Sequence, residues 1–217
     1  ADFNAAFDLN ATITVHPRDL EVYADAASRA YGEPNPALTF SYGPFAAGEN
    51  ATVLADEPFA FTAADETSPA GTYDLNATGG FDPNYHFVYH GSVLTVVAAG
   101  QQIEDFAVQP EVVYGDVLPD LNATATSGLQ VTYSSDEPDI VEVDGVHLLV
   151  KGAGTTVIRA HQDGDGSADF NAAFDLNATI TVHPRDLEVY ADAASRAYGE
   201  PNPALTLHYG PFAADEN

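Results

Sequence analysis

The sequence predicts an all-β chain that consists of small sandwich-like modules in tandem. The composition is rich in Val, Thr, Tyr and Phe and contains 17 Gly and 14 Pro residues, which favours strands and turns over helices. No long stretch places apolar residues at the three- and four-residue spacing of an amphipathic helix. Many short segments instead alternate apolar and polar residues, which is the period of a strand with one buried face.

An internal repeat sets the organisation of the chain. Residues 1–50 recur as residues 168–217, and only three pairs of residues differ between the two copies. The differing pairs are Phe40 and Leu207, Ser41 and His208, and Gly48 and Asp215. Self-similarity at a fixed period indicates an array. We therefore expect the sequence to be a window on a longer tandem repeat, cut at both ends.

Composition and charge exclude several classes of function. The 33 acidic and 6 basic residues give a net charge of −27, so the chain repels nucleic acid and anionic membrane surfaces. The absence of Cys excludes disulfides, thiolate metal sites and a cysteine nucleophile. No apolar run approaches the roughly 18 residues of a membrane span, and no signal peptide is visible. We expect a halophilic, marine or calcium-loaded setting that screens this charge, with an ordinary acidic secreted protein as the alternative.

The chain begins with the expected end of a domain and continues into a first module. Residues 1–17 alternate as a strand until His16-Pro17, where proline removes a backbone donor, so a boundary is expected at Pro17. The first module is predicted over residues 18–99, with an opening strand at residues 20–24 and turns at 31–36 and 68–71. The aromatic run at 85–89 and the apolar run at 93–97 are predicted to form a hairpin with an aromatic core face.

The second module is predicted over residues 100–184 as a sandwich of short strands. Its clearest feature is Asp144-Gly145 between the apolar runs 140–143 and 146–150, which predicts a hairpin with a type I′ turn. Residues 174–182 repeat the strand of residues 7–15. After Pro184 the first module begins again, and residues 185–217 are its N-terminal part. That part is expected to be frayed or held by a neighbouring chain.

The order and spacing of these motifs resemble two known module families. Residues 18–99 resemble the YGX-type modified beta-grasp module, MBG. The motifs that carry this resemblance are Tyr-Gly-Glu-Pro-Asn-Pro-Ala-Leu at 31–38, Ser-Pro-Ala-Gly-Thr-Tyr at 68–73, Asn-Tyr at 84–85 and Gly-Ser-Val-Leu-Thr-Val at 91–96.

Residues 100–184, in turn, resemble a bacterial immunoglobulin-like domain. The motifs are Tyr-Gly-Asp at 114–116, Ser-Gly-Leu-Gln-Val-Thr-Tyr-Ser-Ser at 127–135, Gly-Ala-Gly-Thr-Thr at 152–156 and Phe-Asn-Ala-Ala at 170–173. On this resemblance, residues 1–17 are the C-terminal strand of a truncated immunoglobulin-like domain. The two families alternate in giant bacterial surface proteins and adhesins. The resemblance implies β-sandwich and beta-grasp-like modules in an extended array, an extracellular stalk or spacer role and no catalytic residues.

An acidic loop is the one candidate metal site. Asp163, Asp165, Ser167 and Asp169 place side-chain oxygens at alternate positions, which is how a short loop surrounds calcium. The match to an EF-hand loop is partial, because Ala168 stands where glycine is needed and Phe174 where glutamate is needed. The alternative is a flexible acidic turn, since Asp and Gly are common turn residues. No other cofactor is expected.

Five Asn-Ala-Thr triplets match the acceptor pattern for N-linked glycosylation. They begin at Asn10, Asn50, Asn76, Asn122 and Asn177. In four of them, strand alternation places the asparagine opposite the apolar side chains, where a glycan fits. The same pattern also arises from a half-exposed strand alone, because threonine is a good strand former.

The remaining residues give no sign of catalysis. We find no nucleophile elbow, phosphate loop or histidine-rich metal motif, and with 33 acidic residues paired carboxylates cannot single out a glycosidase site. His86 and His90 share a strand face but lie about 13 Å apart, too far for one metal ion. Exposed polar positions are expected for them and for His16, His147, His161, His183 and His208.

These observations predict a non-enzymatic stalk repeat of a long extracellular cell-surface protein, in which one pair of modules forms the repeating unit. The expected partners are neighbouring copies of the repeat in cis, and in trans where chains associate, without nucleic acid or direct membrane contact. One alternative is the building repeat of an extracellular filament, sheath or surface layer with lateral contacts. Another, less favoured, is a glycan- or surface-binding module, whose nearest candidate is the outward face at His86, Val88 and His90.

Overall fold

The structure is a computed structural model that describes residues 11–213 of the chain. Within this range the regular structure consists of strands and one short 3-10 helix, η1 (Ala51–Val53), with no α-helix. The all-β fold class is therefore confirmed. The chain divides into two compact units, residues 1–99 and residues 100–217.

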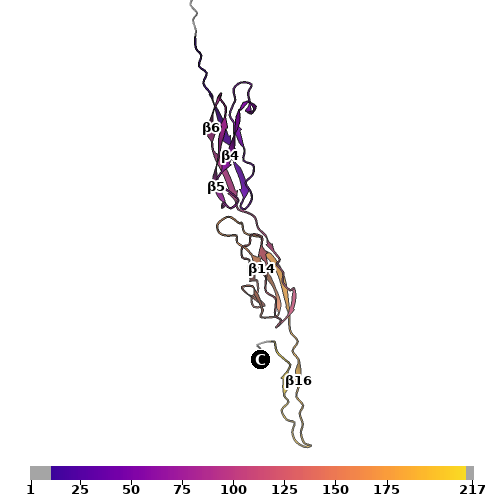
Figure 1. The fold of residues 1–217 in the computed structure, drawn as a ribbon. Helices are drawn as coiled ribbons and strands as arrows, with labels where there is room; N and C mark the ends of the chain where they lie inside the picture. Colours follow the sequence, from indigo (N-terminus) through magenta and orange to yellow (C-terminus); the bar gives the residue numbers. More distant parts are fainter. Residues whose placement is uncertain (1–10, 214–217) are drawn as a thin grey trace, which may run out of the picture. The chain divides into compact units, whose positions relative to one another are not determined.

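The first unit is a sandwich of two sheets (Figure 1). The three-stranded sheet has the order β3-β1-β6, with β1 (Arg18–Ala24), β3 (Phe40–Tyr42) and β6 (Tyr85–His90). The four-stranded sheet has the order β2-β7-β5-β4, with β2 (Ala27–Ala30), β4 (Asp56–Thr62), β5 (Gly71–Phe81) and β7 (Ser92–Val97). The pairs β1–β6 and β2–β7 are parallel, and the other pairs are antiparallel.

The core of the first unit draws side chains from both sheets. Val22 on β1 belongs to one cluster with Leu75 on β5 and Leu94 on β7, and all three side chains are fully buried. Alternation along each strand turns these residues inward while their neighbours face solvent. Each such side chain contributes about 1.5–3 kcal/mol of stability by its burial.

The hairpin predicted between residues 85–89 and 93–97 does not form. β6 pairs in parallel with β1, whereas β7 pairs with β5 and β2, so two consecutive strands belong to different sheets. A single residue, Gly91, separates them, and a tight hairpin needs a loop of about two residues. The chain therefore crosses from one sheet to the other at Gly91. The expected aromatic core face is formed in part, since Tyr85 is buried and Phe87 packs against the core.

Arg29 fixes the turn that contains the Tyr-Gly-Glu-Pro-Asn-Pro motif. Its side chain is 7% exposed, and its Nε donates a hydrogen bond of 2.7 Å to Asn35 Oδ1. A second guanidinium nitrogen donates to the carbonyl of Asp65, and Asn35 Nδ2 donates to the carbonyl of Ala64 at 2.7 Å. A buried guanidinium is tolerated because its donors are satisfied. The turn is thereby tied to the connection between β4 and β5.

The second unit contains a four-stranded sheet of order β11-β14-β15-β9. Its strands are β9 (Glu111–Val113), β11 (Thr132–Ser135), β14 (Gly154–His161) and β15 (Leu176–His183). Two further pairs lie in residues 100–184: β8 (Ile103–Glu104) with β10 (Thr124–Ala125), and β12 (Val141–Asp144) with β13 (His147–Val150). The β15–β9 pair is parallel, and the other pairs are antiparallel.

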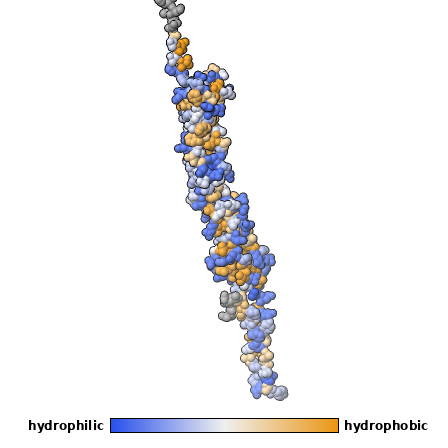
Figure 2. All heavy atoms as spheres, in the orientation of Figure 1, coloured by the Kyte–Doolittle hydropathy of each residue, from blue (hydrophilic) through white to orange (hydrophobic). Residues whose placement is uncertain are grey.

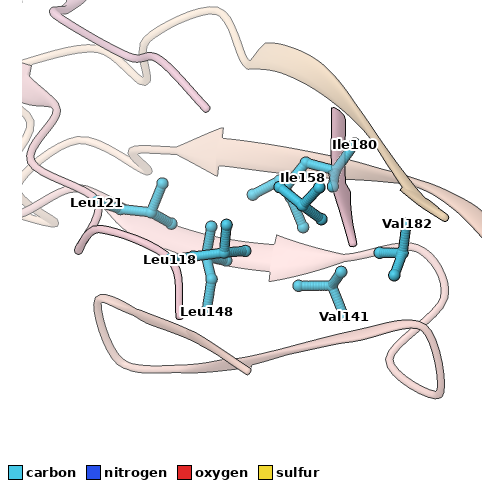
Figure 3. Packing of buried hydrophobic residues seen from close by; sticks show 8 residues of the cluster. Leu118, Leu121, Val141, Leu148, Ile158, Ile180 and Val182 are labelled. Atoms are coloured by element: carbon cyan, nitrogen blue, oxygen red, sulfur yellow. The ribbon is translucent and has the colours of Figure 1, made fainter. Parts of the chain in front are cut away.

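The core of the second unit lies between the four-stranded sheet and the β12–β13 hairpin. Figure 3 shows Ile158 and Ile180, from neighbouring strands, in one cluster with Val141 and Leu148 from the hairpin. The two isoleucines and Val141 are fully buried. The hairpin therefore supplies one wall of this core.

The β12–β13 hairpin forms at the predicted place but with a different turn. Asp144 pairs with His147, so the two loop residues are Gly145 and Val146 rather than Asp144 and Gly145. Gly145 has φ = 62°, whereas Val146 does not have a positive φ. This is the pattern of a type II′ turn, which needs a positive φ only at its first central residue. The predicted type I′ turn needs two positive φ angles, and glycine is available for only one of them.

The two copies of the repeat differ in how completely their strands are paired. β15 pairs with β14 and β9, which buries Ile180 completely, but Ile13, its counterpart in the first copy, is 88% exposed. Residues 11–17 form no strand, and the rest of the expected strand, residues 1–10, lies outside the described residues. The reason is that no described segment pairs with residues 11–17 as β14 and β9 pair with β15.

Residues 185–213 retain part of the first module. β16 (Val189–Ala191) pairs with β17 (Leu207–Tyr209) in the register of β1 and β3, with each residue replaced by its counterpart in the second copy. In this segment, which was expected to be frayed or held by a neighbouring chain, β16 therefore keeps a strand partner on one of its two edges. The apolar side chains of both strands remain exposed, because the described residues offer no counterpart of the second sheet.

Two adjacent leucines of β13 test the core of the second unit. Leu148→Ala is expected to destabilise this unit by about 2–4 kcal/mol, because it removes a buried side chain and leaves a cavity. Leu149→Ala is the matched control, because Leu149 is 42% exposed against 7% for Leu148. Hydrogen exchange of the β14 amides across a urea series measures both changes. Equal destabilisation by the two variants would contradict the assignment of faces.

The arginine copies provide a second matched pair. Arg29→Lys is expected to destabilise the first unit by about 1–3 kcal/mol, because lysine cannot reproduce the branched hydrogen bonding to Asn35 and Asp65. Arg196 bonds Asn202 at the same 2.7 Å but is exposed, so Arg196→Lys is expected to change stability by less than about 0.5 kcal/mol. Hydrogen exchange of the β2 and β7 amides measures the loss of stability in each variant. Equal losses in Arg29→Lys and Arg196→Lys would rule out an anchoring role for Arg29.

Candidate functional site

The outward face at His86, Val88 and His90 lies on the three-stranded sheet of the first unit. Parallel pairing places Asp19 beside His86 and Tyr23 beside His90 on this face. The opposite side of the same strands carries the buried core residues. The face is therefore built by β1 and β6 together, from segments that lie far apart in the sequence.

Each histidine of this face contacts a carboxylate of β1. His86 Nδ1 lies 3.0 Å from Asp19 Oδ1, and His90 Nε2 is hydrogen-bonded to Glu21. The ring of Tyr23 stacks on the ring of His90, with centroids 4.6 Å apart and planes 14° from parallel. The aromatic content of the face is one stacked pair rather than a row. Its polar chemistry consists of exposed contacts between histidine rings and carboxylates.

Histidine–carboxylate pairs recur in the second unit. His147 Nδ1 lies 2.6 Å from Asp120 Oδ1, and His208 Nδ1 lies 2.6 Å from Asp192 Oδ1. His183 is 3.7 Å from Glu111. Exposed pairs of this kind contribute little to stability, about 0–1 kcal/mol each. They do bring the side chains that change charge near neutral pH into direct contact with the acidic surface.

His161 makes two such contacts at once. Its Nδ1 is hydrogen-bonded to Asp175, and its Nε2 lies 2.6 Å from Asp163 Oδ1. The hydrogen bonds with Asp175 and then Asp163 raise the pKa of His161 above its ordinary value. The hydrogen bond from His161 also lowers the pKa of Asp175. The guanidinium of Arg159, 3.6 Å from Asp175, lowers it further. The ring is thus held between two carboxylates.

The acidic loop is divided between two sets of contacts. Asp165 accepts hydrogen bonds from the backbone N–H of Ser167 at 3.1 Å and from its hydroxyl at 2.5 Å, and these bonds lower the pKa of Asp165. The Ser167 hydroxyl also lies 3.3 Å from Asp169 Oδ2. Asp163 instead contacts the His161 ring. The structure therefore brings three of the four predicted calcium ligands together and directs the fourth to a histidine.

The geometry of this loop bears on the calcium prediction in two further ways. Ala168 has φ = 73°, in the left-handed region where glycine is favoured, so a non-glycine residue adopts the turn that a calcium loop requires. Among residues 11–213, however, no three side chains of His, Cys, Asp or Glu are grouped so that they could hold a metal ion. The calcium site stays a prediction.

The predicted glycosylation sites occupy different local structures. Asn76 lies on β5 and Asn177 on β15, and both are exposed. Asn122 is exposed just before β10, whereas Asn50 caps η1 and accepts hydrogen bonds from Thr52, the threonine of its own triplet. Asn10 lies outside the described residues. All four described asparagines are accessible at the surface.

The described surface mixes apolar and polar residues. Figure 2 shows hydrophobic residues dispersed among hydrophilic ones on the visible face. Among the described residues, no helix is long and apolar enough to cross a membrane. The sequence did not predict the histidine pairs, because every carboxylate partner except Asp163 comes from a distant part of the sequence. The only sequence signal was the large excess of acidic residues around seven histidines.

Comparison with known proteins identifies a family match in the first unit. The family model of the MBG domain (YGX type) matches residues 20–95. The first unit is therefore similar to an MBG domain over most of its length. The match ends before the second unit begins. A comparison with curated proteins finds no relative.

The solved structures that match the chain include the following three. Drosophila N-cadherin EC1-3 is 8% identical with a TM-score of 0.29, over 78% of this chain and 69% of that structure. Drosophila N-cadherin EC1-4 is 7% identical with a TM-score of 0.32, over 90% and 60%. A C-terminal 282-residue fragment of intimin, in complex with the intimin-binding domain of its translocated receptor, is 16% identical with a TM-score of 0.29, over 79% and 65%. The chain thus spans less than two thirds of the last two.

His161 gives a pH-dependent test. Its folded pKa is raised, so its pairing stabilises the second unit below the unfolded pKa of about 6.5, and this contribution is lost as the pH rises through the folded pKa. Wild type is therefore expected to lose stability relative to His161→Gln between about pH 6 and pH 8. The lowered pKa of Asp175 acts in a separate window, because its contribution is lost only as the pH falls below about 4.

The pKa of His161 is measured directly by NMR titration of the ring protons. It is expected to lie above 6.5 in the wild type and to fall in Asp175→Asn, which removes the carboxylate that has the largest effect. Asp163→Asn is the matched comparison and is expected to lower the pKa less. A wild-type value at or below 6.5 would contradict the double pairing.

Proposed function

We propose that this chain is a repeat segment of a long extracellular cell-surface protein, where it serves as a stalk that provides reach and rigidity for adhesion or attachment. The observation that carries the proposal is the repeat itself. Residues 1–50 and 168–217 differ at only three positions, so the segment from residue 185 onward starts as the first module does. The MBG match in the first unit supports a place among surface proteins.

The preserved strand register supports the proposal in structural terms. Val22 pairs with Tyr42, and Val189 pairs with Tyr209, which is the same pair in the second copy of the repeat. The copied sequence thus forms the same antiparallel pair again, between residues 189–191 and residues 207–209. Alternation of an MBG domain with an immunoglobulin-like domain is the arrangement that this copy implies.

Separate cores suit such an arrangement. The first unit has its own buried cluster around Leu75 and Leu94, and the second unit has another around Ile158 and Ile180. Each unit can therefore be repeated without losing its core, as in other repeat proteins. The joints His16-Pro17-Arg18 and His183-Pro184-Arg185 are short, and proline restricts both itself and the residue before it, which limits bending.

The proposal includes no catalytic role. Neighbouring copies in the same molecule are the primary partners, and the net charge of −27 keeps separate chains apart unless salt or divalent cations screen it. A halophilic or calcium-rich exterior fits this requirement. Reach, rather than affinity, is what the repeat adds to the whole protein.

Electron microscopy of native cell-surface material, with an antibody against the repeat, tests the proposal. Isolated thin threads that carry label along their length are the expected result, because a stalk holds its tip away from the surface by single chains. Regular filaments or sheets with lateral packing would contradict it and would assign the repeat to a filament, sheath or surface layer. Cells from which the repeat has been deleted are the control for labelling.

A further inference from the structure

Two exposed phenylalanines lie side by side on an edge strand of the first unit. Phe59 and Phe61 are on β4, at the end of the order β2-β7-β5-β4, and are 57% and 43% exposed. Their ring centroids are 6.3 Å apart. Alternation turns Pro58 inward, so the two rings project from the outer face of the sheet. A pair of large apolar rings on an acidic surface is exposed at a cost unless something covers it.

The outer face beside these rings carries a glycosylation triplet. β4 and β5 are neighbouring strands (Figure 1), and their register places Phe61 opposite Asn76 and Phe59 opposite Thr78. Asn76 and Thr78 are exposed, while Ala77 between them is buried. Directly opposite residues of an antiparallel pair have Cβ atoms about 4.5–5.5 Å apart. Both functional residues of the triplet are thus in reach of an aromatic ring.

The surface around Asn76 is hollowed. A shallow depression of about 430 Å³ is lined on one side by Phe61 and Thr62 and on the other by Tyr73, Asp74 and Asn76. On its other side the asparagine packs closely against Gly91, where a side-chain carbon would lie 2.8 Å from Asn76 Oδ1. Asn76 thus borders a hollow, with two rings on the neighbouring strand.

The other described triplets stand in different surroundings. Asn177 is paired with Arg159 across the strands, and Asn50 is hydrogen-bonded to its own threonine. Asn122 lines a depression of about 340 Å³ with Tyr133, but Tyr133 is half-buried and stacks on Phe106. Two exposed rings on the neighbouring strand, one of them directly opposite the asparagine, distinguish Asn76 from these three.

We propose that Asn76 carries an N-linked glycan whose first sugar packs on Phe61 and Phe59. In the modification step, Asn76 Nδ2 bonds to the anomeric carbon of a lipid-linked sugar phosphate or pyrophosphate. The bond from that carbon to the phosphate oxygen breaks, the lipid phosphate leaves with the bonding electrons, and the amide loses one proton. The lipid-linked sugar is the donor, and a membrane-bound oligosaccharyltransferase catalyses the transfer. The step is a group transfer and needs no oxidant or reductant.

The packing follows from the chemistry of sugars and aromatic rings. One face of a pyranose ring presents C–H groups, whose positively polarised hydrogens are attracted to the negative face of an aromatic ring. A sugar on Asn76 would also remove apolar ring surface from water, which stabilises the modified protein. The glycan would in addition hinder another chain from pairing with the edge of β4. These effects do not depend on a stalk role, because they require only that the chain meets the transferase.

Peptide mapping by mass spectrometry of the protein from its native source is the first test. A sugar mass increment on the peptide that contains Asn76, lost in Asn76→Gln, is expected. An unmodified Asn76 peptide in the native protein would overturn the proposal, whatever the state of the other triplets.

A double-mutant cycle in the native source tests the aromatic contact. Asn76→Gln is expected to lower the melting temperature of the first unit by roughly 4 °C, because it removes the contact between the sugar and the ring. A shift of about this size corresponds to the loss of one modest contact in a domain of this length. In the Phe61→Thr background the same substitution is expected to lower it by less than half as much, because the ring is gone. Threonine retains strand preference on this exposed position, so the variant is expected to fold.

Asn177→Gln is the matched control, since it removes a triplet from an exposed strand face where the residue directly opposite is Arg159 rather than a phenylalanine. It is expected to leave the melting temperature unchanged. Equal effects of Asn76→Gln in both backgrounds would overturn the packing of the sugar on Phe61. Failure of the stalk proposal in microscopy would leave these results unaffected, so the two proposals are tested separately.

Discussion

Strand pairing over long sequence distances is the constraint on which this structure depends. The repeat demonstrates it within one chain, because nearly identical segments stand in different surroundings. Ile180 is fully buried in β15, whereas Ile13, in the same local sequence, is exposed in a segment that forms no strand. Local preference alone does not form a strand; a backbone partner is needed as well, and burial of its side chains requires a facing core.

The same constraint explains what each motif contributes. The Tyr-Gly-Glu-Pro-Asn-Pro turn is held by the buried Arg29, which ties it to the connection between β4 and β5. In the second copy, Arg196 bonds Asn202 in the same way but is exposed. The local part of the motif therefore forms wherever the sequence occurs. Its burial, and with it most of its contribution to stability, requires the rest of the module.

The surface of the chain combines a large negative charge with a few local contacts and exposed apolar rings. The net charge of −27 disfavours association between chains, and several histidines contact carboxylates from other parts of the sequence. The pair of phenylalanines on β4 exposes apolar rings at the edge of its sheet. A covalently attached sugar would give these rings a partner without creating an interface between chains.

The sequence by itself determined the all-β class, the internal repeat and which side chains of a strand share a face, because strand alternation has a period of two and is a local property. It also determined which asparagines have the acceptor pattern for glycans. Only the tertiary structure decided that β6 pairs with β1 rather than β7 and that Phe61 lies opposite Asn76. It also decided that Asp163 contacts His161 instead of joining the other predicted calcium ligands of its loop. The two strand pairings depend on burial across two sheets, and the contact of Asp163 depends on how the loop folds back on the end of β14. Side-chain pattern fixes the faces of a strand but not the identity of its neighbour.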